Sequence, residues 1–391
     1  ERHMNEKRSR TVNSSYINRL NKISVLRLIR DEGRISRAEI AKKTELSAPT
    51  ITRIADDLIS KEKLISLVGE GESKGGRRPK MLRFNSKENF VIGIDLRATC
   101  IRGALSNLDG ELILEREVPT KLEDGYEKIM EQIGSVINSL ILRGGDKGAK
   151  VLGIGLAVAG SVNRQTGIIE RAPVFNWKNV DVVSGLKAYT PLPVFCDNVS
   201  RLMALGELWY GLGSGYQDFI CVNLDHEISA GMIINGKPLF GSNGYAGEFG
   251  RSILEHGSSS IGLSQMVEGE LAKREASAVL KEKTGSAYKV GGGDKDKVEL
   301  KLCDKSIDYL AVVLDTLIKL FNPECIILSG GLTRTKEFLL DKLEKEVRKY
   351  SIPNLSANVK VIGSSFGENA ALMGTFSLIL NKILNLEIKV I

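Results

Sequence analysis

Small, hydroxylic and cationic side chains gather at two places near the start of the chain. The first is a short segment over residues 47–53, and the second is a glycine-rich stretch over 71–80. Cations beside glycines can approach phosphates closely, and small side chains with an arginine can reach base edges in a groove. We therefore take as DNA-binding candidates Ser47, Ala48, Thr50, Thr52, Arg53, Lys74, Arg77, Arg78 and Lys80, and with them Arg37, which lies ten residues before the first segment.

Three helices and two strands must position these side chains. Apolar residues at helical spacing predict a first helix over 16–31. Ser36, with a glutamate three residues later, is a capping box for a second helix over 36–43. Ser47 caps a third helix over 47–60 that has a proline in its first turn. Two helices joined by a tight turn are typical of the helix-turn-helix, whose second helix enters the major groove.

A β-wing follows these helices. Strands are predicted over 64–68 and 81–84, and the loop between them carries four of the candidate cations. Residues 1–87 hold 21 Lys and Arg against 11 Asp and Glu, a net charge of +10, whereas the rest of the chain has a net charge of −3. A basic head on a slightly acidic body favours a nucleic-acid partner. The alternatives are a solvated basic tail or a small helical domain that binds another protein.

Composition excludes several classes of protein. Apolar residues make up 42% of the 391 residues and charged residues 26%, which is ordinary for a globular chain. No run of 18 apolar residues occurs, so we expect no membrane span. The five cysteines are widely spaced and form no CxxC pair, which argues against a disulfide framework and a structural zinc site. We expect a cytoplasmic protein.

The body, residues 88–391, alternates strands and helices. Its first half opens on three strands with a hairpin turn at Asp109-Gly110, so an α/β chain with antiparallel hairpins is expected. Strands are predicted over 90–95, 100–105, 112–118, 151–158, 193–196, 219–224, 230–235 and 325–329. Helices are predicted over 124–143, 199–211, 262–282 and 306–321.

Six segments make the body similar to the ROK family of repressors, open reading frames and sugar kinases. They are VIGIDLRAT (91–99), GIGLAVAGSVNRQTG (153–167), PVFCDNVSRLMALGE (193–207), NGYAGEFG (243–250), FNPECIILSGGL (321–332) and GENAALMG (367–374). The resemblance implies an actin-like, two-lobed ATPase fold of the ribonuclease H-like type. The repressor branch of the family adds a winged helix-turn-helix. The implied domains are a winged helix over 14–87, an N-terminal lobe over 88–195 plus about 372–391, and a C-terminal lobe over 196–371.

The resemblance also implies where a kinase would hold its catalytic base. The family aspartate lies seven residues before the glycine of LGE, and this position is Val199. Valine cannot accept a proton, so we expect no catalytic residue. Asp197, two residues away, would serve only if the protein is a kinase after all, and ATP and Mg²⁺ would be cofactors only in that case.

The phosphate-binding segments of the family are altered here. The first hairpin, DxGxT in the family, keeps Asp95 and Thr99 but has Arg97 in place of glycine. The second, GTGxG in the family, aligns with the acidic run 225–229, which would repel a triphosphate. A glycine pair, Gly330-Gly331, matches the adenosine side, although a plain strand-to-helix turn explains it equally well.

The sugar site implied by the resemblance is partly kept. Asn198 and Glu248 are retained, Arg251 stands at the position of the family histidine, and Trp177 could stack on a sugar ring. Each has a structural alternative. Asn198 could cap a helix, and Trp177 could be a buried wall residue. Glu248 could form a hydrogen bond at a hinge, or Glu248 and Arg251 could form an ion pair within the protein. The zinc-binding loop of the family aligns with 257–264, which has no cysteine, so no metal is expected.

These observations predict a sugar-responsive transcription regulator, in particular a repressor, whose kinase-like body no longer catalyses a reaction. Its expected partners are operator DNA, a sugar or sugar derivative, and a second copy of the chain or a higher homo-oligomer. The first alternative is an ATP-dependent sugar kinase of the glucokinase or N-acetylhexosamine kinase type. The second is a regulator that has lost its effector and responds to a protein partner.

Overall fold

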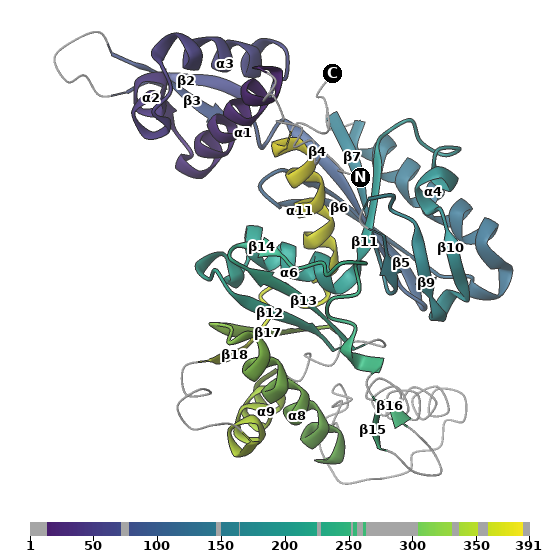
Figure 1. Ribbon diagram of the computed structural model, residues 1–391. Helices are drawn as coiled ribbons and strands as arrows, with labels where there is room; N and C mark the ends of the chain where they lie inside the picture. The colour runs from purple at the N-terminus through teal and green to yellow at the C-terminus, as the bar shows by residue number, and fades with distance from the viewer. Residues whose placement is uncertain are drawn as a thin grey trace, which may run out of the picture.

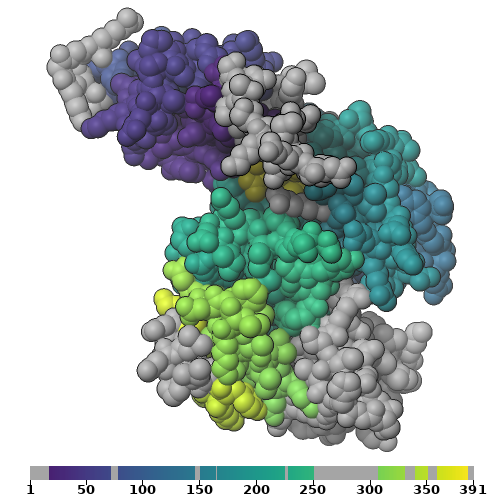
Figure 2. All heavy atoms as spheres, viewed as in Figure 1, coloured from purple at the N-terminus to yellow at the C-terminus, as the bar shows by residue number. Residues whose placement is uncertain are grey.

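The computed structural model of the chain consists of a small head and two larger lobes (Figure 1). The structure describes residues 14–71, 78–145, 150–163, 165–224, 228–251, 253–255, 261–262, 304–330, 336–350 and 359–385. The head stands at one end of the molecule, as the space-filling view also shows (Figure 2). The described residues contain no helix that is long and apolar enough to cross a membrane.

The head is a three-helix unit with a three-stranded antiparallel sheet in the order β1-β3-β2. Both predicted caps are confirmed: the Ser36 hydroxyl accepts from the backbone N–H of Glu39 at 3.3 Å, and Ser47 accepts from Thr50 at 3.4 Å. The elements are α1 (Ser14–Glu32), β1 (Ile35–Ser36), α2 (Arg37–Thr44), α3 (Ala48–Ser60), β2 (Ile65–Glu70) and β3 (Lys80–Phe84). The winged helix-turn-helix is therefore confirmed.

The apolar stripe expected along α1 is only partly buried. Val25, Leu26 and Ile29 are fully buried, whereas Ile17 and Leu20 are 47% and 48% exposed. The first turns of α1 therefore reach beyond the apolar core of the head. The core itself continues into the body, because the apolar residues of α1 and β3 belong to one cluster with those of α11 (Ala370–Leu384).

The upper lobe is built on a five-stranded mixed sheet in the order β11-β7-β4-β5-β6. Its strands β11, β7 and β4 are parallel, and the β4–β5 and β5–β6 pairs are antiparallel hairpins, as expected. A methyl group on Gly103 would touch α4, and one on Gly155 would touch α11, so the two helices cover opposite faces. The elements are β4 (Asn89–Leu96), β5 (Cys100–Asn107), β6 (Leu112–Pro119), α4 (Gly125–Gly145), β7 (Lys150–Val158) and β11 (Val194–Asn198).

A small three-stranded sheet and a short helix flank this lobe, and the hydrophobic pattern did not reveal them. Their strands are too short to show a period of two. They are β8 (Ser161–Val162), β9 (Ile169–Ala172), β10 (Trp177–Val180) and α5 (Val182–Leu186), with the small sheet in the order β10-β9-β8.

The lower lobe has its own five-stranded sheet in the order β14-β13-β12-β17-β18. Apolar side chains alternate between its faces: one face packs on α6 (Val199–Tyr210), and the other on α8 (Asp304–Phe321) and α9 (Lys336–Tyr350). The strands are β12 (Phe219–Asn223), β13 (Ser229–Ile234), β14 (Lys237–Pro238), β17 (Cys325–Ser329) and β18 (Lys360–Gly363). The helix predicted over 262–282 lies outside the described residues.

Helices α6 and α11 cross between the two lobes and touch through glycine. A methyl group on Gly206 would lie 2.9 Å from the backbone nitrogen of Gly374, and one on Gly374 would clash with the carbonyl of Leu202. Helix α11 lies against the sheet of the upper lobe, although it follows the lower lobe in the sequence. Because both helices pack across the two lobes, the residue limits of the lobes remain a prediction.

The helix crossing predicts that a Gly→Ala substitution here lowers the free energy of unfolding, whereas such a substitution inside a helix usually raises it. Gly→Ala inside a helix normally stabilises a protein by about 0.5–1 kcal/mol. Gly374→Ala should instead lower the free energy of unfolding by about 1–3 kcal/mol, because the new methyl group overlaps the backbone of α6. Urea denaturation measures the change. Gly145→Ala is the control, since nothing lies within 4 Å of that site. A gain in stability for Gly374→Ala would contradict the close crossing.

Candidate functional site

The exposed start of α3 carries most of the candidate DNA-binding residues. Ser47, Ala48, Thr52 and Arg53 are exposed, and Thr50 is half-buried with its hydroxyl 2.9 Å from that of Ser47. In Figure 1, α3 lies on the side of the head away from the two lobes, whereas α1 lies on the near side. The first turn of α3 is therefore placed where a duplex could reach it.

Two arginines of this surface are held by neighbouring helices. The Arg53 guanidinium donates to the side-chain oxygen of Asn18 on α1, and it remains exposed. Arg37 pairs with Asp56 on α3 at 2.8 Å. Arg37 thus ties α2 to α3, a positioning role that its sequence position did not suggest.

The wing is described only at its base. Arg78 and Lys80 are exposed there, and Lys74 and Arg77 lie outside the described residues. On the opposite strand, the backbone carbonyl of Glu70 accepts a hydrogen bond from Arg34 at 2.9 Å. Arg34, which sequence reasoning missed, therefore links the start of the wing to the turn before α2.

Three other arginines, all on α1, face the body instead of DNA. Arg19 donates to the backbone carbonyl of Asn385 at 2.9 Å, and Arg27 donates to its side-chain oxygen at 2.8 Å. The Arg30 guanidinium lies 4.1 Å from the ring centre of Trp209. Asn385 follows the end of α11, and Trp209 lies in the last turn of α6. Helix α1 therefore contacts the ends of both crossing helices.

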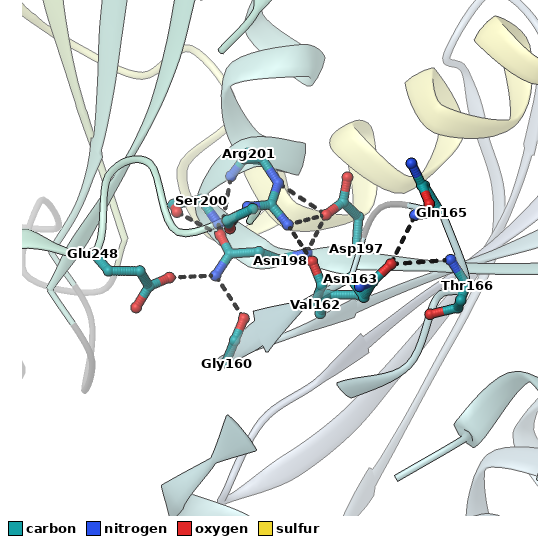
Figure 3. A network of polar contacts seen from close by, with 11 residues as sticks. Gly160, Val162, Asn163, Gln165, Thr166, Asp197, Asn198, Ser200, Arg201 and Glu248 are labelled. Atoms are coloured by element: carbon teal, nitrogen blue, oxygen red, sulfur yellow. Dashed lines mark hydrogen bonds and ion pairs between the residues drawn. The ribbon is translucent and has the colours of Figure 1, made fainter. Parts of the chain in front are cut away.

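Asn198 lies between the lobes, at the junction of β11 and α6 (Figure 3). Its side-chain oxygen accepts from the backbone of Ser200 at 2.9 Å and of Arg201 at 3.2 Å, so it caps α6. Its amide nitrogen donates to the carbonyl of Gly160 at 2.8 Å and to Glu248 at 3.0 Å. The structural alternatives given above for Asn198 and Glu248 are therefore both present: Asn198 caps α6, and Glu248 accepts a hydrogen bond from it across the two lobes.

Arg201, which sequence reasoning missed, is a second bridge between the lobes. It is 3% exposed and pairs with Asp197 at 2.5 Å. It also donates to the carbonyl of Gly244 in the lower lobe at 2.6 Å and to that of Val162 in the upper lobe at 3.2 Å. The spacing of Asp197 and Arg201 is the i, i+4 pattern of a helical ion pair, which is the one signal the sequence offered.

A third contact holds the same lower-lobe segment against the upper lobe. The Tyr245 hydroxyl donates to Glu170 at 2.7 Å, and Asn163 donates to the other oxygen of Glu170 at 3.1 Å. These two hydrogen bonds lower the pKa of the Glu170 carboxyl below its usual value. Gly244, Tyr245 and Glu248 thus form a row of polar contacts across the boundary between the lobes.

Of the remaining effector candidates, Trp177 is not brought to this row. Trp177 is 7% exposed and packs in the upper-lobe core, with its ring 4.8 Å from Phe175 and 5.6 Å from Tyr126. Arg251 ends a short 3-10 helix, and its side chain lies outside the description. Val199 is 8% exposed in the first turn of α6 and packs among apolar residues.

The hairpin that binds phosphate in the kinases is filled by the protein's own side chains. Asp95 is 2% exposed and pairs with Arg97 at 2.6 Å. Arg97 and Arg102 both donate to the carbonyl of Glu368, at 2.9 and 2.8 Å. The carboxylate is therefore already neutralised, and a side chain stands where a glycine would let the backbone approach phosphate. These residues do not fit a triphosphate.

The other nucleotide and metal positions are described only in part. Thr99 is exposed, and Gly330 has φ +101° with Leu224 packed so closely that a side chain would clash. Gly330 is thus explained by packing alone, whereas Gly331 and residues 225–227 lie outside the described residues. Most of the loop 257–264 is outside as well. In the described part of the chain, no three His, Cys, Asp or Glu side chains are grouped so that they could hold a metal ion.

A capped winged helix on a two-lobed, kinase-like body defines a protein that joins a DNA-binding unit to a small-molecule-binding unit. Two family models match this division. Residues 19–64 match the winged helix-turn-helix DNA-binding model, and residues 91–382 match that of the ROK family. The chain belongs to the ROK family.

Relatives of known name match either the whole chain or the body alone. The xylose repressor of Caldicellulosiruptor bescii is 28% identical and covers 95% of this chain and 98% of its own. The glucokinase of Thermotoga maritima is 27% identical and covers 75% of this chain and 98% of its own. A crystal structure of a ROK family transcriptional regulator, a homologue of the E. coli MLC protein, superposes with a TM-score of 0.77 at 23% identity, over 94% of this chain and 97% of that one. The last likeness supports the fold alone.

Proposed function

We propose that this protein is a sugar-responsive transcriptional repressor and not a sugar kinase. The observation that carries the proposal is the union of a complete winged helix with a body whose catalytic-base position is the buried Val199. The xylose repressor matches head and body together, whereas the glucokinase matches the body only. The head binds operator DNA, and the body reports whether a sugar is present.

The effector is a sugar held between the lobes by Asn198, Glu248 and Arg251, and D-xylose is the first candidate because of the relative's name. A sugar that binds one arrangement of the lobes better than the other shifts the population of that arrangement. The protein works as a homodimer, since heads of this kind read paired half-sites. It acts in the cytoplasm, where its DNA is, and needs no ATP, Mg²⁺ or zinc.

DNA binding is tested by two arginine substitutions with different expected signatures. Arg53→Ala should weaken operator binding by about 1–3 kcal/mol and relax sequence preference, if Arg53 leaves Asn18 to contact a base edge. Arg77→Ala should weaken binding on all sequences and flatten its salt dependence, because it removes a phosphate contact. Mobility shifts over a salt series measure both. Arg348→Ala on α9, remote in sequence from the head, is the control. Binding that does not depend on salt would contradict the proposal.

Sugar phosphorylation should be absent. Loss of a general base costs a kinase about 10²–10⁴ in rate, and here the phosphate hairpin is also occupied by Arg97. A coupled assay of ADP release with ATP, Mg²⁺ and D-xylose, D-glucose or N-acetyl-D-glucosamine should stay at background. Turnover in the kinase range of about 1–100 s⁻¹ would overturn the proposal. Asp197 would then be the base, even though it pairs with Arg201.

Effector binding should raise the melting temperature and change operator affinity. A thermal-shift screen of neutral sugars and sugar phosphates identifies the ligand. Glu248→Ala and Arg251→Ala should each weaken the shift, because each removes a polar partner of the ligand. Glu344→Ala is the matched control, since this carboxylate lies on α9 and pairs with Arg348 of the same helix. A screen without any hit would favour a regulator that answers to a protein partner.

A further inference from the structure

A pocket lies between the lobes, on the other side of Asn198 from Glu248. Its volume is about 450 Å³, and neither Asn198 nor Glu248 lines it. Figure 3 shows Glu248 and Asp197 on opposite sides of Asn198. The pocket is bounded by β11, α6 and the last turns of α11, by the turn after β8, and by the segment after β13 of the lower lobe. It is therefore distinct from the cleft proposed above.

The wall of this pocket offers an acceptor that the protein leaves unused. Oδ1 of Asp197 takes both hydrogen bonds from Arg201 and one from the backbone of Asn198. No described residue donates to Oδ2, and in Figure 3 that oxygen is turned away from Arg201. An ionised carboxylate is acceptor-only, so this oxygen calls for a ligand that donates, such as a hydroxyl group.

The other lining groups suit the two sides of a sugar ring. Phe195 and Phe240 line the pocket with aromatic carbon, each beside a cation: Lys382 lies 5.0 Å from the ring centre of Phe195, and Arg201 lies 5.7 Å from that of Phe240. Gln165, Thr166 and Asn381 offer amide and hydroxyl groups to the rim of a sugar ring. A phosphate at the depth of Asp197 would face a carboxylate, and the charge of Arg201 is already matched by that carboxylate. The other cation among the lining residues, Lys382, is directed at the ring of Phe195. The chemistry therefore favours an uncharged polyol.

We propose that this pocket binds a neutral pentose or hexose, as a second sugar site in addition to the cleft. Asp197 accepts from a ring hydroxyl, Phe240 packs on the ring, and Asn381 bonds at its edge. At about 450 Å³ the pocket is within the range of ligand pockets in proteins and has room for one such ring.

The second site would act on the head by a short route. Asn385 lines the pocket, and the same residue accepts hydrogen bonds from Arg19 and Arg27 of α1. A ligand that bonds to Asn385 changes the acceptor on which the head is docked. Both lobes line the pocket, so its width also changes with the angle between them. Occupancy and head position are therefore coupled.

Calorimetric titration of the full chain with D-xylose, D-glucose and N-acetyl-D-glucosamine tests the second site. Glu248→Ala weakens the proposed cleft site, and binding that survives this change is assigned to the pocket only where a change in the pocket weakens it further. Adding Leu378→Trp fills the pocket from α11, and adding Phe240→Ala removes its ring. Each should weaken the surviving binding about tenfold or more. Leu320→Trp, a like change at a side chain that is 70% exposed, is the matched control and should not alter it.

The outcomes separate this site from the proposed function. Sugar binding by the wild type that disappears in Glu248→Ala would overturn the second site and leave the cleft as effector site. Surviving binding that Leu378→Trp and Phe240→Ala leave unchanged would also overturn it, as would tighter binding of D-glucose 6-phosphate than of D-glucose. No binding of any of these sugars by the wild type would overturn it too. Thermal unfolding of every variant checks the fold, and Phe240→Ala keeps the test valid if Leu378→Trp does not fold.

Discussion

The contact between α6 and α11 is the constraint on which the rest of the structure depends. Gly206 and Gly374 bring the two backbones together, with no room for a methyl group on either side. Because the helices cannot separate without exposing this contact, they form the axis about which the lobes are arranged. The cleft residues lie near the start of α6, and the head contacts the far ends of both helices. A change at one end of the axis is thus carried to the other by rigid elements.

Along this axis, groups that a kinase would use on its substrates are satisfied within the protein. Asp95 is paired with Arg97, Asn198 caps α6, and Arg201 joins Asp197 to carbonyls of both lobes. Such internal bonds do not suit phosphoryl transfer, because the charged side chains pair with each other instead of contacting a nucleotide. They do suit a sensor, since every bond across the cleft is one that a ligand can replace.

Local signals predicted most of the head and the strands of the body. The capping serines, the proline in the first turn of α3 and the strong periodicity of the core act within a few residues, and all were readable. The bridges between lobes were not, because Arg201 reaches carbonyls 39 and 43 residues away in the sequence, and Arg19 reaches Asn385 across 366. Trp177 shows why two interpretations stayed open in the sequence: an aromatic residue near the motifs could be a sugar platform or a buried wall residue, and only its neighbours Phe175 and Tyr126 show that it packs in the core.

The polar contacts between head and body, which act in addition to their shared apolar core, have energies in the range that an effector can supply. Hydrogen bonds such as those from Arg19 and Arg27 to Asn385 contribute about 0.5–1.5 kcal/mol each, and an arginine over an indole ring adds about 0.5–2 kcal/mol, the larger value applying where the pair is shielded from water, as Arg30 largely is. Typical coupling energies between ligand sites are about 1–3 kcal/mol. A ligand that alters one or two of these contacts therefore changes the position of the head without unfolding the apolar core that head and body share. A larger interface would fix the head beyond the reach of a sugar, and a weaker one would leave the head unable to sense it.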